Sequence, residues 1–365
     1  MTFIPVLKIK KWKRLLVNFL LNSFTDKIIP YSAQLEVTLR CNAKCPFCTF
    51  PTITKEINYK ELSTQQFIKL ISDISDVGIK ILTFTGGEPT LRKDLPTLVY
   101  HAGVKNDLIT SIATNGYLMP ELLKVKKLVA GLDYLLLSLD YPIAELHDKS
   151  RGIKIFEKVM KTIDIALKKD IKVIISTVVM KDNMNLLEDI CELTNNLGIS
   201  IELYPCENII RDFPNKSYYL DSVNKLIPDL NIWAEKMMHL RKKYNNILTD
   251  PISIEVIKKG GFGANSELYQ NILRCHVAET HLFVRYDGYI DFPCKIHPLL
   301  SINALKFPIS KIYQLKEVRS IINKRDGFPF CNGCRLGCAI TSSLTKNWIS
   351  LLNKYILGYL RGNLN

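Results

Sequence analysis

Short apolar runs alternate with segments of helical periodicity between Gln34 and Tyr204. Apolar runs of about four to eight residues are typical of buried strands, and apolar residues three or four apart are typical of helices. The predicted strands are Gln34–Thr38, Ile81–Thr85, Ile109–Thr114, Tyr134–Asp140, Lys172–Val179 and Ile201–Tyr204. The predicted helices between them are Ser63–Val77, Leu95–Val104, Glu121–Val129, Ile155–Lys168 and Leu186–Leu197. This alternation predicts an α/β fold with parallel strands, closed as a partial (β/α)6 barrel because six units are too few for the complete eight-fold barrel.

The pattern changes after Tyr204, and we divide the chain accordingly. Residues 1–30 are predicted to form a basic amphipathic segment, 31–210 the barrel, 211–270 a charge-rich helical connector, 271–340 a small cysteine-rich domain, and 341–365 an amphipathic C-terminal helix. In parallel sheets, ligands gather at the carboxyl ends of the strands. Residues directly after each strand are therefore the first candidates for function.

Both ends of the chain have the pattern of amphipathic helices. Val6–Phe24 contains five basic residues and no acidic one, and its apolar residues would share one helical face. Trp348–Leu360 has a similar apolar spacing. Such helices either lie on an anionic membrane or pack on their own domain, and we favour the membrane. Neither apolar run is long enough to span a bilayer.

The net charge of +14 predicts attraction to an anionic partner: a membrane surface, a phosphorylated substrate or nucleic acid. We find no nucleic-acid-binding motif and expect no nucleic acid. Eight of the ten cysteines fall in two groups, at 41–48 and 275–338. Clustered cysteines in a long chain favour metal over disulfides. Metal-binding thiolates need a reducing compartment, so we predict a cytoplasmic protein, either free or peripheral on the inner face of the membrane.

The first cysteine group, Cys41, Cys45 and Cys48, directly follows the first predicted strand. A structural zinc ion would need a fourth close ligand, and none is nearby. A [4Fe-4S] cluster with three protein ligands would leave one iron open for a cofactor. This CxxxCxxC spacing resembles the radical S-adenosylmethionine (SAM) superfamily. The resemblance implies that the open iron binds SAM, which is reductively cleaved to a 5′-deoxyadenosyl radical that abstracts hydrogen from the substrate. A zinc knuckle or fortuitous cysteines are the alternatives.

The same resemblance implies roles for further residues after the strands. Phe47 matches the aromatic position beside the adenine, and Gly86-Gly87-Glu88-Pro89 looks like the GGEP motif, with Glu88 an acceptor for the methionine ammonium. Paired glycines would let the backbone approach the ligand. Candidate ribose ligands are Ser138 and then Asp140, and Arg151 is a candidate partner for the SAM carboxylate. Each residue also has a purely structural interpretation, and their joint occurrence in order favours the functional one.

Three residues in this half of the chain are left with a structural or open role. Cys191 lies among apolar neighbours of a predicted helix and is expected in the core. Cys206 follows the sixth strand and faces either the site or the core. His147 is left unassigned, because a lone histidine in a loop is more often a packing or surface residue.

The second cysteine group brackets a hairpin signal, Asp287-Gly288. The five cysteines are Cys275, Cys294, Cys331, Cys334 and Cys338, and their spacing also suits zinc. After a radical SAM core, the region resembles the SPASM/twitch extension, which carries auxiliary iron–sulfur clusters. Five cysteines, rather than the seven of the full SPASM form, imply the twitch form with one auxiliary [4Fe-4S] cluster. By that pattern the ligands are Cys275, Cys294, Cys331 and Cys334, with Cys338 an alternative ligand or a bystander.

The amphipathic ends and the positive charge lead to our first functional hypothesis, radical modification of a membrane-associated, lipid or isoprenoid, substrate. The alternative is modification of a peptide or protein, as in maturation of ribosomal peptides or of cofactors. A third hypothesis, a non-enzymatic electron-transfer protein, does not explain the GGEP motif. In either enzymatic case the resemblance implies a reductase such as ferredoxin or flavodoxin as electron donor.

Overall fold

The computed structural model describes residues 28–213, 216–264, 273–344 and 346. The predicted amphipathic segments Val6–Phe24 and Trp348–Leu360 lie outside the described residues. Among the described residues, no helix combines the length and the apolar character needed to cross a membrane.

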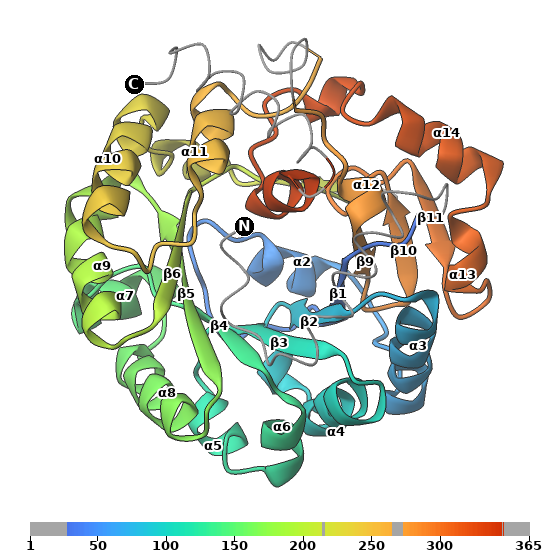
Figure 1. Ribbon diagram of the computed structural model, residues 1–365, viewed down its shortest axis with the longest axis horizontal. Helices are drawn as coiled ribbons and strands as arrows, with labels where there is room; N and C mark the ends of the chain where they lie inside the picture. Colours follow the sequence, from blue (N-terminus) through green and yellow to red (C-terminus); the bar gives the residue numbers. More distant parts are fainter. Residues whose placement is uncertain (1–27, 214–215, 265–272, 345, 347–365) are drawn as a thin grey trace, which may run out of the picture.

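Six parallel strands pair in sequence order and form the barrel. They are β1 (Ser32–Thr38), β2 (Ile81–Gly86), β3 (Ile109–Thr114), β4 (Tyr134–Ser138), β5 (Lys172–Val179) and β6 (Ser200–Pro205). Figure 1 shows the strands curving around the centre, with α3, α4, α6, α8 and α9 on the outside. The structure therefore confirms the predicted partial (β/α)6 barrel.

The helices of the barrel agree with the apolar periodicity, with a few differences. They are α2 (Phe50–Glu56), α3 (Thr64–Val77), α4 (Leu95–Tyr100), α5 (Met119–Leu122), α6 (Lys126–Gly131), α7 (Ala144–Arg151), α8 (Phe156–Lys168) and α9 (Leu187–Asn196). The predicted helix Glu121–Val129 is split between α5 and α6 because Val125 is extended. The segment that contains His147, expected as a loop, forms α7. Ser63 caps α3 through a capping box with Gln66.

The predicted helical connector 211–270 begins differently from the prediction. A small hairpin, β7 (Arg211–Phe213) and β8 (Lys216–Tyr218), precedes α10 (Leu230–Lys243) and α11 (Pro251–Lys258). Phe213 and Tyr218 hold the hairpin together by an edge-to-face ring contact, with centroids 5.6 Å apart. Each strand has three residues, which are too few to show a strand period in the sequence.

The cysteine-rich region continues the sheet of the barrel. Strand β9 (His281–Val284) pairs in parallel with β1, and the antiparallel strands β10 (Tyr289–Phe292) and β11 (Leu300–Asn303) extend the edge. Figure 1 shows these strands beside β1, with α12 (Val277–Thr280), α13 (Ile309–Ile312) and α14 (Lys316–Lys324) around them. Gly288 has φ 83°, which confirms the predicted Asp-Gly turn. The strand pairing places the second cysteine group next to β1, the strand that leads into the first group.

Candidate functional site

Cys41, Cys45 and Cys48 lie on the loop between β1 and α2. All ten cysteines of the chain are among the described residues, and none is in a disulfide. Burial raises the pKa of Cys41 to about 12 and that of Cys48 to about 11, and the neighbouring thiols contribute in the same direction. Backbone N–H groups of Ala43 and Phe50 donate to the sulfurs of Cys41 and Cys48, respectively. Cys45 is buried, and Cys41 and Cys48 are half-buried. Three such neighbouring thiols need a cationic partner to become thiolates together, and a metal cluster supplies that charge.

The GGEP turn holds the cysteine loop by its backbone. The Gly87 N–H donates to the Thr38 carbonyl at 2.9 Å, and the Glu88 N–H donates to the Arg40 carbonyl at 2.7 Å. A Cβ atom at Gly86 would lie 2.2 Å from the Thr38 oxygen, and one at Gly87 would lie 2.3 Å from the Arg40 oxygen. The glycines were predicted to bring backbone close to a cofactor, whereas the close approach in the structure is to the loop that carries the cysteines.

The Glu88 side chain is buried, and its carboxylate accepts four hydrogen bonds. Oε1 accepts from the Thr90 N–H at 3.1 Å and from the hydroxyls of Thr90 and Thr114 at 2.6 and 2.7 Å. Oε2 accepts from the Asn115 N–H at 2.7 Å. Burial raises the pKa of Glu88, and these hydrogen bonds oppose that rise. The two contacts from Thr114 and Asn115 tie the end of β2 to the end of β3. The contact with a methionine ammonium stays a prediction.

Asp140, Arg151 and Cys45 converge at the carboxyl end of β4. The Asp140 carboxylate accepts from Arg151 Nη2 at 2.8 Å and from the Val178 N–H at 3.1 Å. Arg151 Nη1 lies 3.9 Å from the Cys45 sulfur, and the guanidinium carbon lies 5.5 Å from the centre of the Phe47 ring. Arg151 Nε is buried and has no hydrogen-bond partner. A guanidinium with an unused buried donor beside Cys45 fits a carboxylate ligand bound there.

His147, unassigned from the sequence, positions Asp140. Its Nδ1 accepts the Asp140 N–H at 3.2 Å, and its side chain is fully buried. Burial, followed by the nearby charge of Arg151, lowers the pKa of His147 to about 3. The imidazole is therefore neutral in the folded protein at pH 7. Sequence spacing could not reveal this role, because the contact depends on the packing of α7 against the end of β4.

Ser138 lies at the end of β4 and is half-buried. It is in register with Ser176 of β5, which in turn is in register with Glu202 of β6. Leu137, Ile175 and Leu203, on the opposite face of these strands, belong to the main hydrophobic core. Ser138 therefore faces the inside of the barrel, where a ligand would lie, and its contact with the ribose stays a prediction.

The two remaining cysteines of the barrel have apolar surroundings. Cys191 of α9 is fully buried in the main core, as predicted. Cys206 is 2% exposed and packs with Tyr141, Met180 and Phe47. Burial raises the pKa of Cys206 to about 12, so its thiol stays protonated at neutral pH. Cys206 thus lies in the same buried apolar cluster against which Phe47 packs, and whether it faces a bound ligand stays a prediction.

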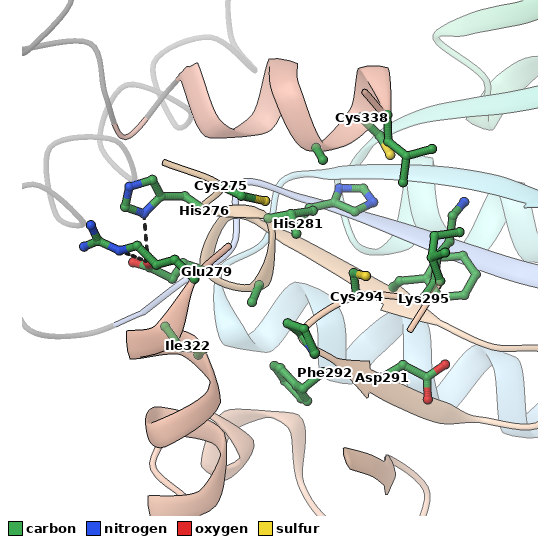
Figure 2. Close-up of a pocket in the computed structure, with 18 of the residues that line it drawn as sticks. Cys275, His276, Glu279, His281, Asp291, Phe292, Cys294, Lys295, Ile322 and Cys338 are labelled. Atoms are coloured by element: carbon green, nitrogen blue, oxygen red, sulfur yellow. Dashed lines mark hydrogen bonds and ion pairs between the residues drawn. The ribbon is translucent and has the colours of Figure 1, made fainter. Parts of the chain in front are cut away.

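The five cysteines of the second group line one cavity of about 60 Å³. Figure 2 shows Cys275, Cys294 and Cys338 around it, reached from different segments of the chain. Burial raises the pKa of Cys275, Cys294 and Cys334, and of Cys331 to about 12; neighbouring thiols contribute in the same direction. Backbone N–H groups two residues further on donate to Cys275, Cys294 and Cys334. Hydrogen bonds of this kind stabilise thiolates, so the chemistry of the cavity fits an iron–sulfur cluster.

The loop Gly260-Gly-Phe-Gly263 supports the CxxC turn of this cavity. The Phe262 N–H donates to the Cys334 carbonyl at 2.8 Å, and the Gly333 N–H donates to the Phe262 carbonyl at 2.9 Å. A Cβ atom at Gly261 would lie 2.2 Å from the Cys334 oxygen. Among the described residues, no three His, Cys, Asp or Glu side chains are arranged to hold a single metal ion. A four-iron cluster has a different requirement, because its thiolates bind separate irons.

A row of polar pairs along the inner face of β1 connects the two cysteine groups. Alternate residues of a strand share one face, and those of β1 contact His281, Lys295, Arg211 and Glu61. The pairs are Ser32 with His281 at 2.8 Å, Gln34 with Lys295 at 3.4 Å, Glu36 with Arg211 at 2.5 and 2.7 Å, and Thr38 with Glu61. Sequence reasoning missed these residues, because their partners are far apart in the chain.

Comparisons with known proteins agree with this geometry. The family model of the radical SAM superfamily matches residues 35–194. A probable GTP 3′,8-cyclase of Methanococcus aeolicus is 30% identical over 272 residues, which cover 72% of this chain and 84% of that protein. A PqqA peptide cyclase of Bradyrhizobium diazoefficiens is 26% identical over 260 residues, 69% of this chain and 68% of that protein. An AdoMet-dependent heme synthase of Oleidesulfovibrio alaskensis is 37% identical over 165 residues, but these span only 42% of its length and 45% of this chain.

The fold is also shared with solved structures. SuiB of Streptococcus suis, bound to the precursor peptide SuiA, superposes with a TM-score of 0.61 at 15% identity. The superposition covers 90% of this chain and 74% of SuiB. The cysteine loop follows β1, the glycine turn holds that loop, and the match to the probable GTP 3′,8-cyclase covers 72% of this chain. These findings have one explanation: this chain is an enzyme that belongs to the radical SAM superfamily.

Proposed function

We propose that this radical SAM enzyme modifies a polar substrate, a peptide or a cofactor precursor. The observation that carries the proposal is the polar inner face of β1 between the two cysteine groups, where Glu36 pairs with Arg211 and Gln34 with Lys295. Across the barrel, Glu202 accepts a hydrogen bond from Ser176, and burial raises the pKa of Glu202. A peptide or a cofactor precursor can exchange hydrogen bonds with these groups.

The lipid hypothesis is less well supported by the same interior. An acyl or isoprenoid chain in the barrel would shield these polar pairs from water without offering hydrogen bonds, which is unfavourable. The named relatives include a peptide cyclase, a heme synthase and a GTP cyclase. SuiB, which shares the fold, was solved with a precursor peptide. The names of these relatives favour our second hypothesis, modification of a peptide or a cofactor precursor, over modification of a membrane lipid.

In this proposal Cys41, Cys45 and Cys48 bind a [4Fe-4S] cluster, and the GGEP turn keeps their loop in place. When bound, the cluster and SAM supply a 5′-deoxyadenosyl radical. Asp140 holds Arg151, whose unused Nε–H would bind the carboxylate of SAM. Phe47 would lie against the adenine, and Ser138 would donate to the ribose from the end of β4. A ferredoxin- or flavodoxin-like reductase is part of the proposal as the source of electrons.

We assign the cavity in the second cysteine group to an auxiliary [4Fe-4S] cluster of a twitch-like region, residues 271–340. Cys275, Cys294, Cys331 and Cys334 are the proposed ligands. The hydrogen bonds to the sulfurs of Cys275, Cys294 and Cys334 support this set. Cys338 lines the same cavity and is the alternative ligand.

The proposal can be tested by following hydrogen from substrate to cofactor. Host cells would be grown in deuterated medium and separated into a peptide and polar-metabolite fraction and a lipid extract. Each fraction would be incubated with anaerobically reconstituted enzyme, SAM and reductant, and 5′-deoxyadenosine would be analysed by mass spectrometry. We expect deuterium in 5′-deoxyadenosine only with the polar fraction, and none with the Cys45→Ala variant. Deuterium transfer from the lipid extract alone would instead establish the lipid hypothesis.

A further inference from the structure

His281 lies in the cavity of the second cysteine group but belongs to no cysteine motif. It is the first residue of β9, and the parallel pairing of β9 with β1 sets it opposite Ser32. Its Nδ1 lies 2.8 Å from the Ser32 hydroxyl oxygen. Figure 2 shows the imidazole ring among the side chains of Cys275, Cys294 and Cys338.

The other ring nitrogen, Nε2, is buried and has no hydrogen-bond partner in the protein. Buried polar atoms in proteins are nearly always paired, and an unpaired one is destabilising. The cavity that the ring lines is also lined by five thiols. A bound group in this cavity is therefore the natural partner for Nε2.

The hydrogen-bonding direction follows from charge. A cluster held by four cysteine thiolates carries negative charge, which favours a donor N–H over a lone pair facing it. Nε2–H is the donor when Nδ1 accepts the hydroxyl hydrogen of Ser32. The cavity already supplies five cysteines for four irons, so a histidine ligand is not needed to complete the cluster. Hydrogen bonds to cluster sulfurs raise its reduction potential, because they stabilise the more negative, reduced state.

We propose that His281 is a positioning residue that donates its Nε2–H to a sulfur of the auxiliary cluster and raises the reduction potential of that cluster. Ser32 holds the imidazole in the required tautomer. The inference rests on the auxiliary cluster proposed above. Strand β1 would then take part in both sites. The end of β1 carries the loop of the first cysteine group, and its first residue, Ser32, orients the imidazole that faces the second cysteine group.

The test isolates the auxiliary cluster in the full-length protein. A variant with Cys41, Cys45 and Cys48 all replaced by alanine would be reconstituted anaerobically, and its iron content and EPR-monitored redox titration recorded. Three further changes would each be introduced into this triple variant. His281→Phe removes the hydrogen-bond donor, and His281→Gln offers an amide N–H that can replace Nε2–H. Ser32→Ala removes the hydroxyl group that orients the imidazole. His101→Phe is the matched control, because His101 also pairs with a serine, Ser72, at 3.1 Å, but outside the cavity.

We expect His281→Phe to keep its iron and to have a lower midpoint potential than the parent triple variant. At the potential where the parent cluster is half reduced, the ratio of reduced to oxidised cluster should be at least about threefold lower in His281→Phe. Ser32→Ala should give a smaller fall, while His281→Gln and His101→Phe should stay near the parent value. An unchanged potential in His281→Phe with full iron would overturn the inference. So would a strong ¹⁵N coupling to the cluster in the parent, since it would identify His281 as a ligand. Absence of iron from the parent triple variant would overturn both the auxiliary cluster and the role of His281.

Discussion

Arg151 bridges Asp140 and Cys45 at the carboxyl end of β4. One terminal nitrogen donates to the Asp140 carboxylate at 2.8 Å, and the other lies 3.9 Å from the Cys45 sulfur. Both charged side chains are buried, Asp140 at 1% and Arg151 at 7% exposure. The ion pair therefore couples the stability of the barrel to the geometry of the first cysteine group.

Replacing Asp140 by asparagine should destabilise the apoprotein by about 3 kcal/mol or more, because it leaves Arg151 charged and buried without its partner. It should also weaken SAM binding, since the guanidinium loses its fixed position. Urea unfolding and SAM titration measure the two effects. Glu121→Gln is the control, because Glu121 pairs with Lys124 on the surface, and such pairs contribute little to stability. Equal unfolding curves for Asp140→Asn and wild type would contradict this account.

Replacing Gly87 by alanine should displace the cysteine loop, because the added methyl group would meet the Arg40 oxygen at 2.3 Å. We expect the variant to lose most of the iron of the first site while the second site keeps its own. Iron analysis and SAM cleavage, measured together, test this. Gly198→Asn is a suitable control, because a Cβ at Gly198 meets nothing within 4 Å and asparagine tolerates its φ of 66°. Full iron in Gly87→Ala would show that the loop adapts.

The buried neutral His147 should make stability depend on pH. Its pKa falls from 6.5 to about 3 on folding because burial disfavours the charged imidazolium. The unfolded chain therefore binds a proton at a higher pH than the folded protein. The neutral imidazole therefore contributes fully to the free energy of unfolding above pH 6.5. That contribution is lost as the pH falls toward 3, at up to about 1.4 kcal/mol per pH unit. Urea midpoints between pH 7 and pH 5 should fall more steeply for wild type than for His147→Leu, and parallel curves would refute the assignment.

Replacing Cys334 by alanine should remove the auxiliary cluster and spare the first one. Total iron should drop from about eight to about four atoms per chain. Production of 5′-deoxyadenosine without substrate should continue, whereas Cys45→Ala should abolish it. Cys191→Ala, in the apolar core, is the control and should keep its iron. Unchanged iron in Cys334→Ala would count against the auxiliary cluster.

Replacing Glu36 by glutamine should affect substrate rather than cofactor. The change keeps the shape of the side chain but removes the charge that holds Arg211 at 2.5 Å. We expect normal iron and normal SAM cleavage in the absence of substrate, but a lower yield of substrate-derived deuterium in 5′-deoxyadenosine. If the deuterium yield equals that of wild type, the polar row on β1 does not contact the substrate.

Much of the fold could be predicted from local pattern. The six barrel strands and the turn at Gly288 each depend on neighbouring residues, so apolar period and turn chemistry were sufficient. The hairpin that begins at Arg211 escaped prediction, because three-residue strands are too short to show a period. The helix that contains His147 was missed because its sequence is largely polar.

The candidate site, like the fold, could be predicted only in part from the sequence. Close spacing in the sequence identified Cys41, Cys45 and Cys48, because residues a few positions apart on one loop must be near one another in space. It could not show that Gly87 packs on Arg40, or that Arg151 reaches Asp140 and Cys45. Those contacts arise only when the ends of β1, β2 and β4 meet at one edge of the sheet.

The sequence by itself determined the class of the fold, the two cysteine groups and the chemistry that their spacing permits. Only the tertiary structure brought Cys275, Cys294 and the 331–338 stretch, which are separated in the chain, around one cavity. It also set Ser32, Gln34 and Glu36 against His281, Lys295 and Arg211. The physical reason is sequence separation. Local propensities act over a few residues, whereas the pairing of β9 with β1 joins segments about 250 positions apart through backbone hydrogen bonds that are independent of side-chain identity.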